Sequence, residues 1–202
     1  MKLLLPPARL TRWVSNFESQ HGTVSLRAED QLYGLASDGS AFTARLPFDL
    51  RYQGPAQVNA FMAAATPPTD WGLLLVRRAG YVMARLAGPE PGAHKISKRW
   101  VQGRSKAGGQ SQQRFARRRE NQAQETYKSA ATSARTLLAG APFLVTGGDR
   151  LAVEETIRLA GLNTQLDSRR LPHTGASRDL LGTAIQSACA LELNIKDVTR
   201  GH

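Results

Sequence analysis

Hydrophobic positions in the first third of the chain follow the spacing of a helix and then that of strands. The predicted helix ends at His21-Gly22. Its buried face, at i, i+3, i+4 and i+7 spacing, consists of Leu10, Trp13, Val14 and Phe17. Apolar runs between turn residues predict strands over residues 23–27, 31–36 and 41–46. With a second short helix over residues 57–65, this pattern predicts a small N-terminal α+β unit over residues 1–66.

The tetrapeptide Thr66-Pro67-Pro68-Thr69 divides the chain, because consecutive prolines make a stiff, non-helical connector. We expect a linker over residues 67–70 and a second domain over residues 71–202. In this domain Ala79-Gly80 would join two strands as a hairpin. The predicted strands of the domain cover residues 72–78, 81–87, 94–101, 143–146, 165–171 and 193–198.

The longest helical pattern of the chain follows the third of these strands. From Ser111, a candidate N-cap, to Leu138 no residue breaks a helix. Its apolar stripe consists of Phe115, Ala123, Tyr127, Ala130, Ala134, Leu137 and Leu138. Arg119 falls on the same stripe, so the first two turns should not be buried. Since about 27 helical residues span about 40 Å, the N-terminal end should project beyond a small sheet.

Strands and helices alternate in the remainder, with helices predicted up to residue 160 and over residues 177–191. This order favours an α/β domain with a mixed sheet flanked by helices, and a chain that is α+β overall. The turn Thr146-Gly147-Gly148-Asp149 could cradle a phosphate at a helix N-terminus. It has neither a Walker lysine nor dinucleotide spacing, so the favoured interpretation is a strand-to-helix turn with Asp149 as N-cap.

The positive charge of the chain is concentrated in one window. The formal net charge is +11, and residues 95–119 hold nine basic side chains and no acidic one. This concentration points to a polyanionic partner. A long run of one sign is often a solvated, flexible tail. Here strand-like segments precede the run and a helical pattern follows it without a break, which favours a binding surface.

The tripeptide Gly108-Gly109-Gln110 lies inside this basic window. Two glycines permit backbone turns that a Cβ would forbid, and they can present the amide of Gln110 to a reacting centre. By itself the tripeptide is a weak signal, because glycine and glutamine are common in the chain. Its weight therefore depends on its surroundings.

Nucleophilic and metal chemistry find little support in the sequence. The four histidines, which are scattered without a nucleophile at a suggestive spacing, are His21, His94, His173 and His202. Cys189 is the only cysteine, which excludes an internal disulfide framework, fits a reducing compartment and favours a small core residue. No His, Cys, Asp or Glu cluster has ligand spacing, so we expect neither a metal nor a cofactor.

The opening residues do not have the pattern of a signal peptide. The apolar stretch of MKLLLPP is short and ends at Pro6, and no window of the chain reaches the length of a membrane span. We therefore expect a soluble, cytoplasmic protein without a membrane partner.

The run GGQSQQRFARRR, from Gly108 to Arg119, resembles the GGQ loop and following helix of the middle domain of eukaryotic and archaeal class-one peptide release factors. The matching residues are Gly-Gly-Gln-Ser, then Arg114-Phe115-Ala116-Arg117, and Arg119. Bacterial decoding release factors and small ribosome-rescue hydrolases follow their GGQ with a different sequence. The order of elements from about Trp71 to Thr199 also resembles that middle domain.

Codon-reading and partner-binding domains are not expected, because only about 66 residues precede the second domain and essentially nothing follows it. The architecture instead resembles that of the actinobacterial release-factor-like peptidyl-tRNA hydrolases, bacterial relatives of the Vms-type hydrolases. The resemblance implies a codon-independent peptidyl-tRNA hydrolase that releases stalled nascent chains at the peptidyl-transferase centre of the large ribosomal subunit. It also implies a monomer with Gly108, Gly109 and Gln110 as catalytic residues.

An RNA path along the basic window accompanies this interpretation. Phosphates of ribosomal RNA or of the tRNA acceptor end would be contacted by Lys98, Arg99, Arg104, Lys106, Arg114, Arg117, Arg118 and Arg119. Trp100 could stack on a base or lie at the edge of the core. The alternative function is a non-catalytic factor that binds ribosomal RNA with the same surface. The two functions differ at Gln110, which only the hydrolase needs.

Overall fold

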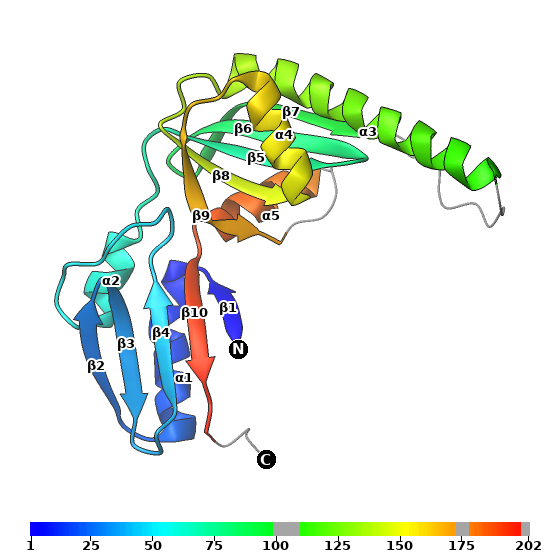
Figure 1. Cartoon of the computed structure of the whole chain (residues 1–202). Coiled ribbons are helices and arrows are strands. Elements are labelled where there is room, and N and C mark those ends of the chain that lie inside the picture. Colours follow the sequence, from blue (N-terminus) through cyan, green and yellow to red (C-terminus); the bar gives the residue numbers. More distant parts are fainter. Residues whose placement is uncertain (99–109, 173–177, 199–202) are drawn as a thin grey trace. The chain divides into compact units, whose positions relative to one another are not determined.

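The computed structural model describes residues 1–98, 110–172 and 178–198, which belong to two units. Unit 1 comprises Met1–Pro67 together with Gln186–His202, and unit 2 comprises Pro68–Ile185. Within the described residues, each unit is built on a five-stranded sheet with helices against it (Figure 1). The mixed α+β fold class predicted from the sequence is confirmed.

The sheet of unit 1 is antiparallel throughout and has the strand order β1-β10-β4-β3-β2. Its strands are β1 (Lys2–Leu5), β2 (Val24–Glu29), β3 (Gln31–Ala36), β4 (Ala41–Arg45) and β10 (Leu191–Lys196). Its helices are the short 3-10 helix η1 (Pro7–Arg9), α1 (Leu10–His21) and α2 (Val58–Ala64). Every second residue of β3 and β4 is buried, because one face of the sheet packs on the helices.

The helix α1 forms the core of unit 1 with the sheet. Phe17 of α1 meets Phe42 of β4 edge to face, with ring centroids 5.3 Å apart. The helix ends at Gly22, as predicted from the sequence, and the φ of 86° at this residue favours glycine. The predicted apolar face of α1 is therefore confirmed, with Leu10, Val14 and Phe17 buried.

Two strands of unit 1 differ from the sequence-based expectation. The apolar opening was not predicted to form structure, but it forms the edge strand β1. The last strand was expected in the sheet of the second domain, but β10 lies between β1 and β4 in unit 1. Leu191 and Leu193 are fully buried in the unit 1 core. Hydrophobic periodicity predicts a strand but not its partners, so this return of the chain to unit 1 was missed.

The sheet of unit 2 is mixed and has the strand order β7-β6-β5-β8-β9. The first three strands pair as an antiparallel meander, whereas β8 and β9 run parallel to β5. The strands are β5 (Trp71–Arg77), β6 (Gly80–Ala87), β7 (Glu90–Lys98), β8 (Phe143–Gly148) and β9 (Gln165–Leu171). Each of these was predicted from the sequence to within a few residues.

Helices cover both faces of the unit 2 sheet. The helices α3 (Gln110–Leu137) and α4 (Arg150–Ala160) lie on one face, and α5 (Arg178–Ala188) lies on the other (Figure 1). Consequently β5, β6 and β8 are buried almost continuously rather than at alternate positions. Small residues such as Ala130 and Ala134 bring α3 close to Leu74 and Met83 of the sheet.

Candidate functional site

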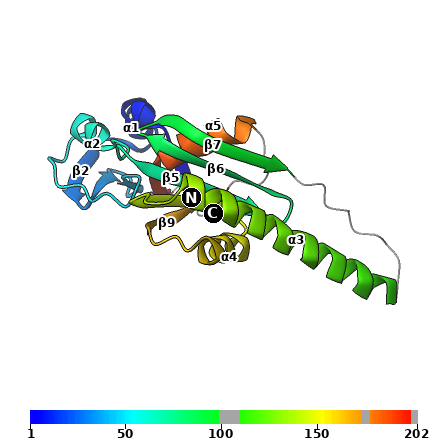
Figure 2. The ribbon, with the colours of Figure 1, turned by 90° about the horizontal axis from the view of Figure 1, so that it is seen from above.

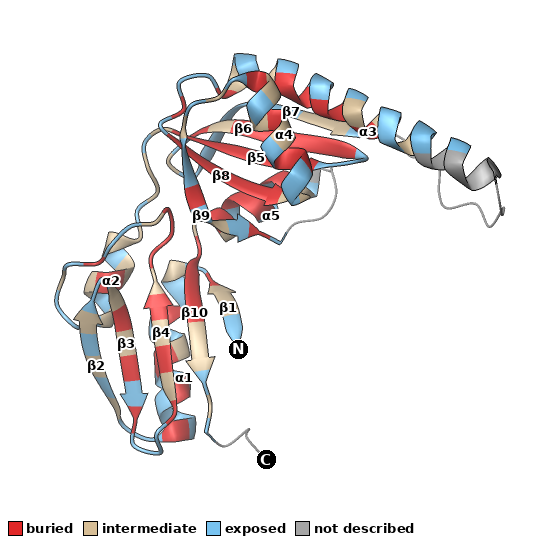
Figure 3. Ribbon diagram, in the orientation of Figure 1, coloured by how far each residue is buried: buried red, intermediate tan, exposed pale blue. Residues whose placement is uncertain are grey.

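The N-terminal half of α3 extends beyond the sheet of unit 2. Ala123 is the first buried residue that the structure describes in this helix, and the positions before it whose exposure is described, 114 and 117–122, are exposed or half-buried (Figure 3). We call residues 110–122 the arm. At 1.5 Å per residue the arm is about 20 Å long, and it passes the end of the sheet (Figure 2). The long projecting helix predicted from the sequence is thus present.

The packing of α3 follows the predicted stripe behind the arm. Buried positions on the predicted stripe are Ala123, Tyr127, Ala130, Ala134 and Leu138. Thr126 and Ala131 are buried beside them, whereas Leu137 is half-buried. The side chain of Phe115 lies outside the described residues.

Three arginines of the arm point away from this stripe. Arg114, Arg117 and Arg118 are exposed and, at 3.6 residues per turn, lie within about 100° of one another around the helix axis. Ala123 lies about 180° from Arg114, so the basic face is opposite to the packed face. Arg119 borders the stripe and is half-buried. None of these arginines forms an ion pair with another described residue.

This arrangement does not serve the stability of the helix. Arg114 and Arg118 are four residues apart, and like charges at this spacing destabilise a helix by about 0.2–0.5 kcal/mol. The first turn of α3 contains no acidic residue that would complement the positive end of the helix dipole. Unpaired, exposed arginines on one face are instead suited to phosphate groups, which accept bidentate hydrogen bonds from guanidinium.

The tripeptide meets the arm at its free end. Gln110 is the first residue of α3, whereas Gly108 and Gly109 lie outside the described residues. The prediction of Ser111 as N-cap is wrong, because the helix begins at Gln110 and Ser111 lies within it. The backbone N–H groups of a first helical turn have no partner within the helix.

The other predicted RNA-binding residues are only partly described. Lys98 is the last residue of β7 and is exposed. Arg99, Arg104, Lys106 and the candidate stacking residue Trp100 lie outside the described residues. The structure therefore places Lys98 and the arginines of α3, and it leaves the segment between them as a prediction.

Tyr81 fixes α3 to the sheet behind the arm. Its ring is almost fully buried, and its hydroxyl lies 3.2 Å from Ser129 Oγ and 3.0 Å from Ser133 Oγ on successive turns of α3. A buried hydroxyl needs such partners, because an unsatisfied one costs about 1–3 kcal/mol. The contact sets the position of α3 on β6.

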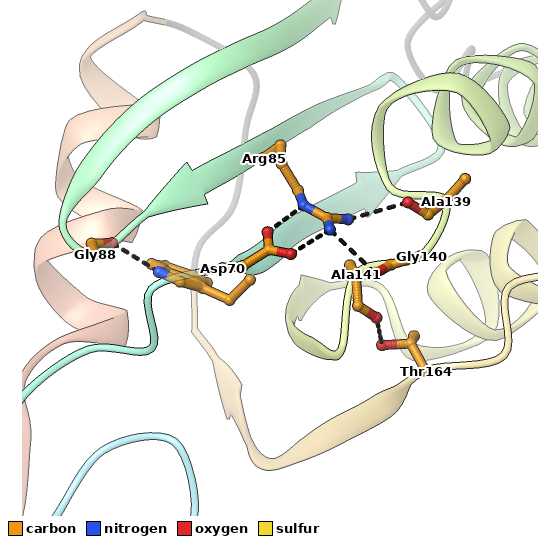
Figure 4. A network of polar contacts seen from close by, with 8 residues as sticks. Asp70, Arg85, Gly88, Ala139, Gly140, Ala141 and Thr164 are labelled. Atoms are coloured by element: carbon orange, nitrogen blue, oxygen red, sulfur yellow. Dashed lines mark hydrogen bonds and ion pairs between the residues drawn. The ribbon is translucent and has the colours of Figure 1, made fainter.

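A second anchor holds the C-terminal end of α3 (Figure 4). The guanidinium of Arg85 binds Asp70 through two hydrogen bonds of 2.5 and 2.6 Å. It also donates to the carbonyls of Ala139 and Gly140, at 3.2 and 3.1 Å. These carbonyls follow the last turn of α3, where a cation is favourable. Sequence reasoning missed this cluster, since its members are 15 to 55 residues apart and no local spacing connects them.

A pocket of about 370 Å³ lies between α3 and the start of α4. Burial, and then the nearby Asp149, raise the pKa of the Tyr127 phenol at its wall. The lining residues are Arg78, Glu120, Gln124, Tyr127, Asp149, Leu151, Glu154, Glu155 and Arg158. With four carboxylates against two guanidinium groups, the pocket does not favour an anion.

The glycine turn before α4 is structural, as the favoured interpretation of the sequence had it. The Asp149 carboxylate accepts the amide of Ala152 at 3.3 Å and caps α4. A Cβ at Gly148 would lie 2.3 Å from Val76 O, so the turn requires glycine at this position. Because a carboxylate already occupies the helix N-terminus, the turn is not a phosphate cradle.

The two histidines that the structure describes, His21 and His94, contact a nearby carboxylate and a backbone carbonyl. His21 at the end of α1 is buried, with Nδ1 2.9 Å from Asp38 Oδ2. The backbone N–H of Ser40, and next His21, hold the pKa of the Asp38 carboxyl below its ordinary value. His94 is exposed on β7, with Nδ1 3.2 Å from the carbonyl of Gly92. His173 and His202 lie outside the described residues.

Over the described ranges 1–98, 110–172 and 178–198, no group of His, Cys, Asp and Glu is arranged to hold a metal ion. No helix in that same part of the chain is long and apolar enough to cross a membrane. Cys189 is half-buried, next to the end of α5.

Comparison with known proteins gives one family. The family model described as "Actinobacteria/chloroflexi VLRF1 release factor" matches residues 69–194, which is more than half of the chain. The matched region contains the sheet of unit 2, the tripeptide, the arm and most of β10. No curated protein matches the chain.

Proposed function

Because the chain belongs to the actinobacteria/chloroflexi VLRF1 release factor family, we propose that it is a codon-independent peptidyl-tRNA hydrolase. It would release stalled nascent chains at the peptidyl-transferase centre of the large ribosomal subunit. The observation that supports this proposal most is the position of Gln110 at the free end of an arginine-bearing arm. Such a factor would act as a monomer in the cytoplasm, where ribosomes translate.

The shape of the arm suits a substrate that is enclosed by RNA. A single helix about 20 Å long can enter a passage that a whole domain cannot, and it carries its arginines along the way. Arg114, Arg117 and Arg118 would contact phosphates that line the passage. We expect their contribution to fall with salt, at about 0.7–0.9 in logarithmic slope for each phosphate neutralised.

The chemistry assigned to the tripeptide is ester hydrolysis. The oxygen of a water molecule attacks the carbonyl carbon that links the peptide to the terminal ribose of the tRNA. The bond between this carbon and the ribose oxygen then breaks, the ribose oxygen takes a proton, and the peptide leaves with a free carboxyl group. The negative charge on the carbonyl oxygen in the intermediate is the feature that a catalyst must stabilise.

Gln110 can serve this step in two ways. Its backbone N–H, presented by Gly108 and Gly109, would donate to the developing oxyanion, and one such donor is worth about 10²–10³ in rate. Its neutral side chain both donates and accepts hydrogen bonds, so it would orient the attacking water. The resemblance to release factors implies that the tRNA ribose and the ribosomal centre supply the remaining groups.

The proposal is tested with large ribosomal subunits that carry peptidyl-tRNA. We expect the purified protein to release the peptide, and we expect Gln110→Ala and Gly109→Ala to slow release by about 10²-fold or more while binding in co-sedimentation persists. Gln113→Ala is the matched control, since it removes the same side chain one turn further along α3. If the wild type releases no peptide but binds, the protein is the non-catalytic ribosome-binding factor instead.

A further inference from the structure

Four strands of unit 2 end on the same side of its sheet. β8 and β9 run parallel to β5, and β7 has the same direction because it is separated from β5 by two antiparallel pairings. The arm extends past this same side (Figure 2). Side chains at these carboxyl ends therefore lie around the root of the arm.

Three exposed basic residues occupy these strand ends. Arg77 ends β5, Lys98 ends β7, and Arg170 is the penultimate residue of β9. We call them the basic edge. Only Lys98 belongs to the basic window that the sequence singles out.

The strand register brings Arg77 and Lys98 to the same face of the sheet. Both pair with Gly80, so they lie two strands apart, at about 10 Å. Only glycine fits between them, because a Cβ at Gly80 would lie 2.2 Å from Ser97 O. No side chain at this position therefore separates the two cations.

Arg170 lies at the same end of the sheet, on the other side of β5 and on the opposite face, because it belongs to the row of Thr146 and Leu74 that packs on α3. It pairs with Thr146 of β8, and its guanidinium lies 3.4 Å from the carbonyl of Gly148. Among the described residues, neither Arg77, Lys98 nor Arg170 forms an ion pair. The neighbouring Arg78 lines the α3–α4 pocket, which contains four carboxylates.

The charge of the two units supports a polyanionic partner for unit 2. Unit 1 holds 8 Lys and Arg against 7 Asp and Glu, whereas unit 2 holds 19 against 9. Cations at one end of a sheet that form no ion pair with another described residue repel one another. A phosphate backbone, with one negative charge at each nucleotide, offsets this repulsion.

We propose that Arg77, Lys98 and Arg170 form a second phosphate-binding surface, which contacts ribosomal RNA at the entrance of the passage that the arm enters. The proposal rests on the proposed function, since it assumes that the tip of the arm reaches the ester inside the large subunit. Arg78 shares a pocket with Gln124, which places this end of the sheet about 20 Å behind Gln110. At this distance from the ester, the surface faces the RNA wall of the subunit.

The test measures binding of the full chain to vacant large subunits over a range of salt concentrations. The variant is Arg77→Gln with Arg170→Gln, and the matched control is Arg27→Gln with Arg135→Gln. The control also removes two exposed arginines, from β2 and from the C-terminal part of α3. We expect the variant to lose about 1.4–1.8 from the slope of log K against log salt, since each phosphate contributes about 0.7–0.9. The control should keep the wild-type slope.

Three results would overturn the proposal that the basic edge binds ribosomal RNA. They are wild-type affinity and slope in the variant, an equal loss in the control, and a loss that occurs with free tRNA but not with vacant subunits. The hydrolase proposal fails separately, because it depends on peptide release by the wild type and by Gln110→Ala. Vacant subunits contain no ester, so this binding measurement is independent of catalysis.

Discussion

At the scale of single residues, Arg85 illustrates how distant side chains position the arm. It joins Asp70 before β5, its own strand β6 and the carbonyls beyond α3 (Figure 4). Its side chain is 25% exposed and that of Asp70 is 48% exposed, so water weakens the ion pair. The cluster is stabilised mainly by its hydrogen-bond geometry, because the planar guanidinium donates to a carboxylate and two carbonyls at once.

We expect Arg85→Met to destabilise unit 2 by about 1–2 kcal/mol, since it keeps the aliphatic stem but leaves the carbonyls unpaired. Hydrogen exchange measured by mass spectrometry should then be about 5–30-fold faster in β5, β6 and the end of α3, and unchanged in unit 1. Arg135→Met, an exposed position on α3, is the control. Equal exchange in Arg85→Met and wild type would show that the cluster does not hold the helix.

At the scale of elements, the helices were predicted more accurately than the sheets. The apolar stripe of α3 and the Asp149 cap of α4 follow from the spacing of residues within or next to a single helix, and no long-range contact is needed to predict them. Contacts such as Tyr81 with Ser129, 48 residues apart, have no local signal. For the same reason the sequence predicted Gln110 at the tip, but not the side chains that fix the helix behind it.

The Tyr81 contact makes a prediction about the docking of α3. Tyr81→Phe removes the hydroxyl between Ser129 and Ser133 without changing the packing of the ring, so we expect a loss of about 0.5–1.5 kcal/mol. Exchange in the middle of α3 should rise accordingly. Tyr33→Phe, a half-buried tyrosine of β3 in unit 1, should leave α3 unchanged. If both variants exchange as the wild type does, the hydroxyl has no part in holding the helix.

At the scale of the whole molecule, the first and last strands that the structure describes, β1 and β10, are neighbours in the same sheet. β10 belongs to unit 1, where it lies between β1 and β4. From the sequence, this strand was expected in the second domain. Strand patterning contains no information on partners, so only the long-range pairing reveals this connection. Unit 2 is thus an insertion between two segments of unit 1.

The pairing of β10 in unit 1 predicts which elements a substitution in β10 destabilises. Leu193→Ala removes a fully buried side chain from the unit 1 core, at a cost of about 2–5 kcal/mol. Exchange should become faster in α1 and β1 to β4, while β5 to β9 keep their protection. The exposed Val198→Ala, just after β10, is the control. Faster exchange in β5 to β9 alone would support the assignment of this strand to the second domain.

The central claim is that Gln110, at the end of the arm, acts on an ester. The most direct measurement is the single-turnover rate of peptide release from peptidyl-tRNA on large subunits, at saturating protein. We predict that the wild type and Gln113→Ala release the peptide at similar rates, and that Gln110→Ala, which keeps the backbone N–H but removes the side chain that orients the water, is slower by about 10²-fold or more. Release by Gln110→Ala at the wild-type rate would contradict this claim.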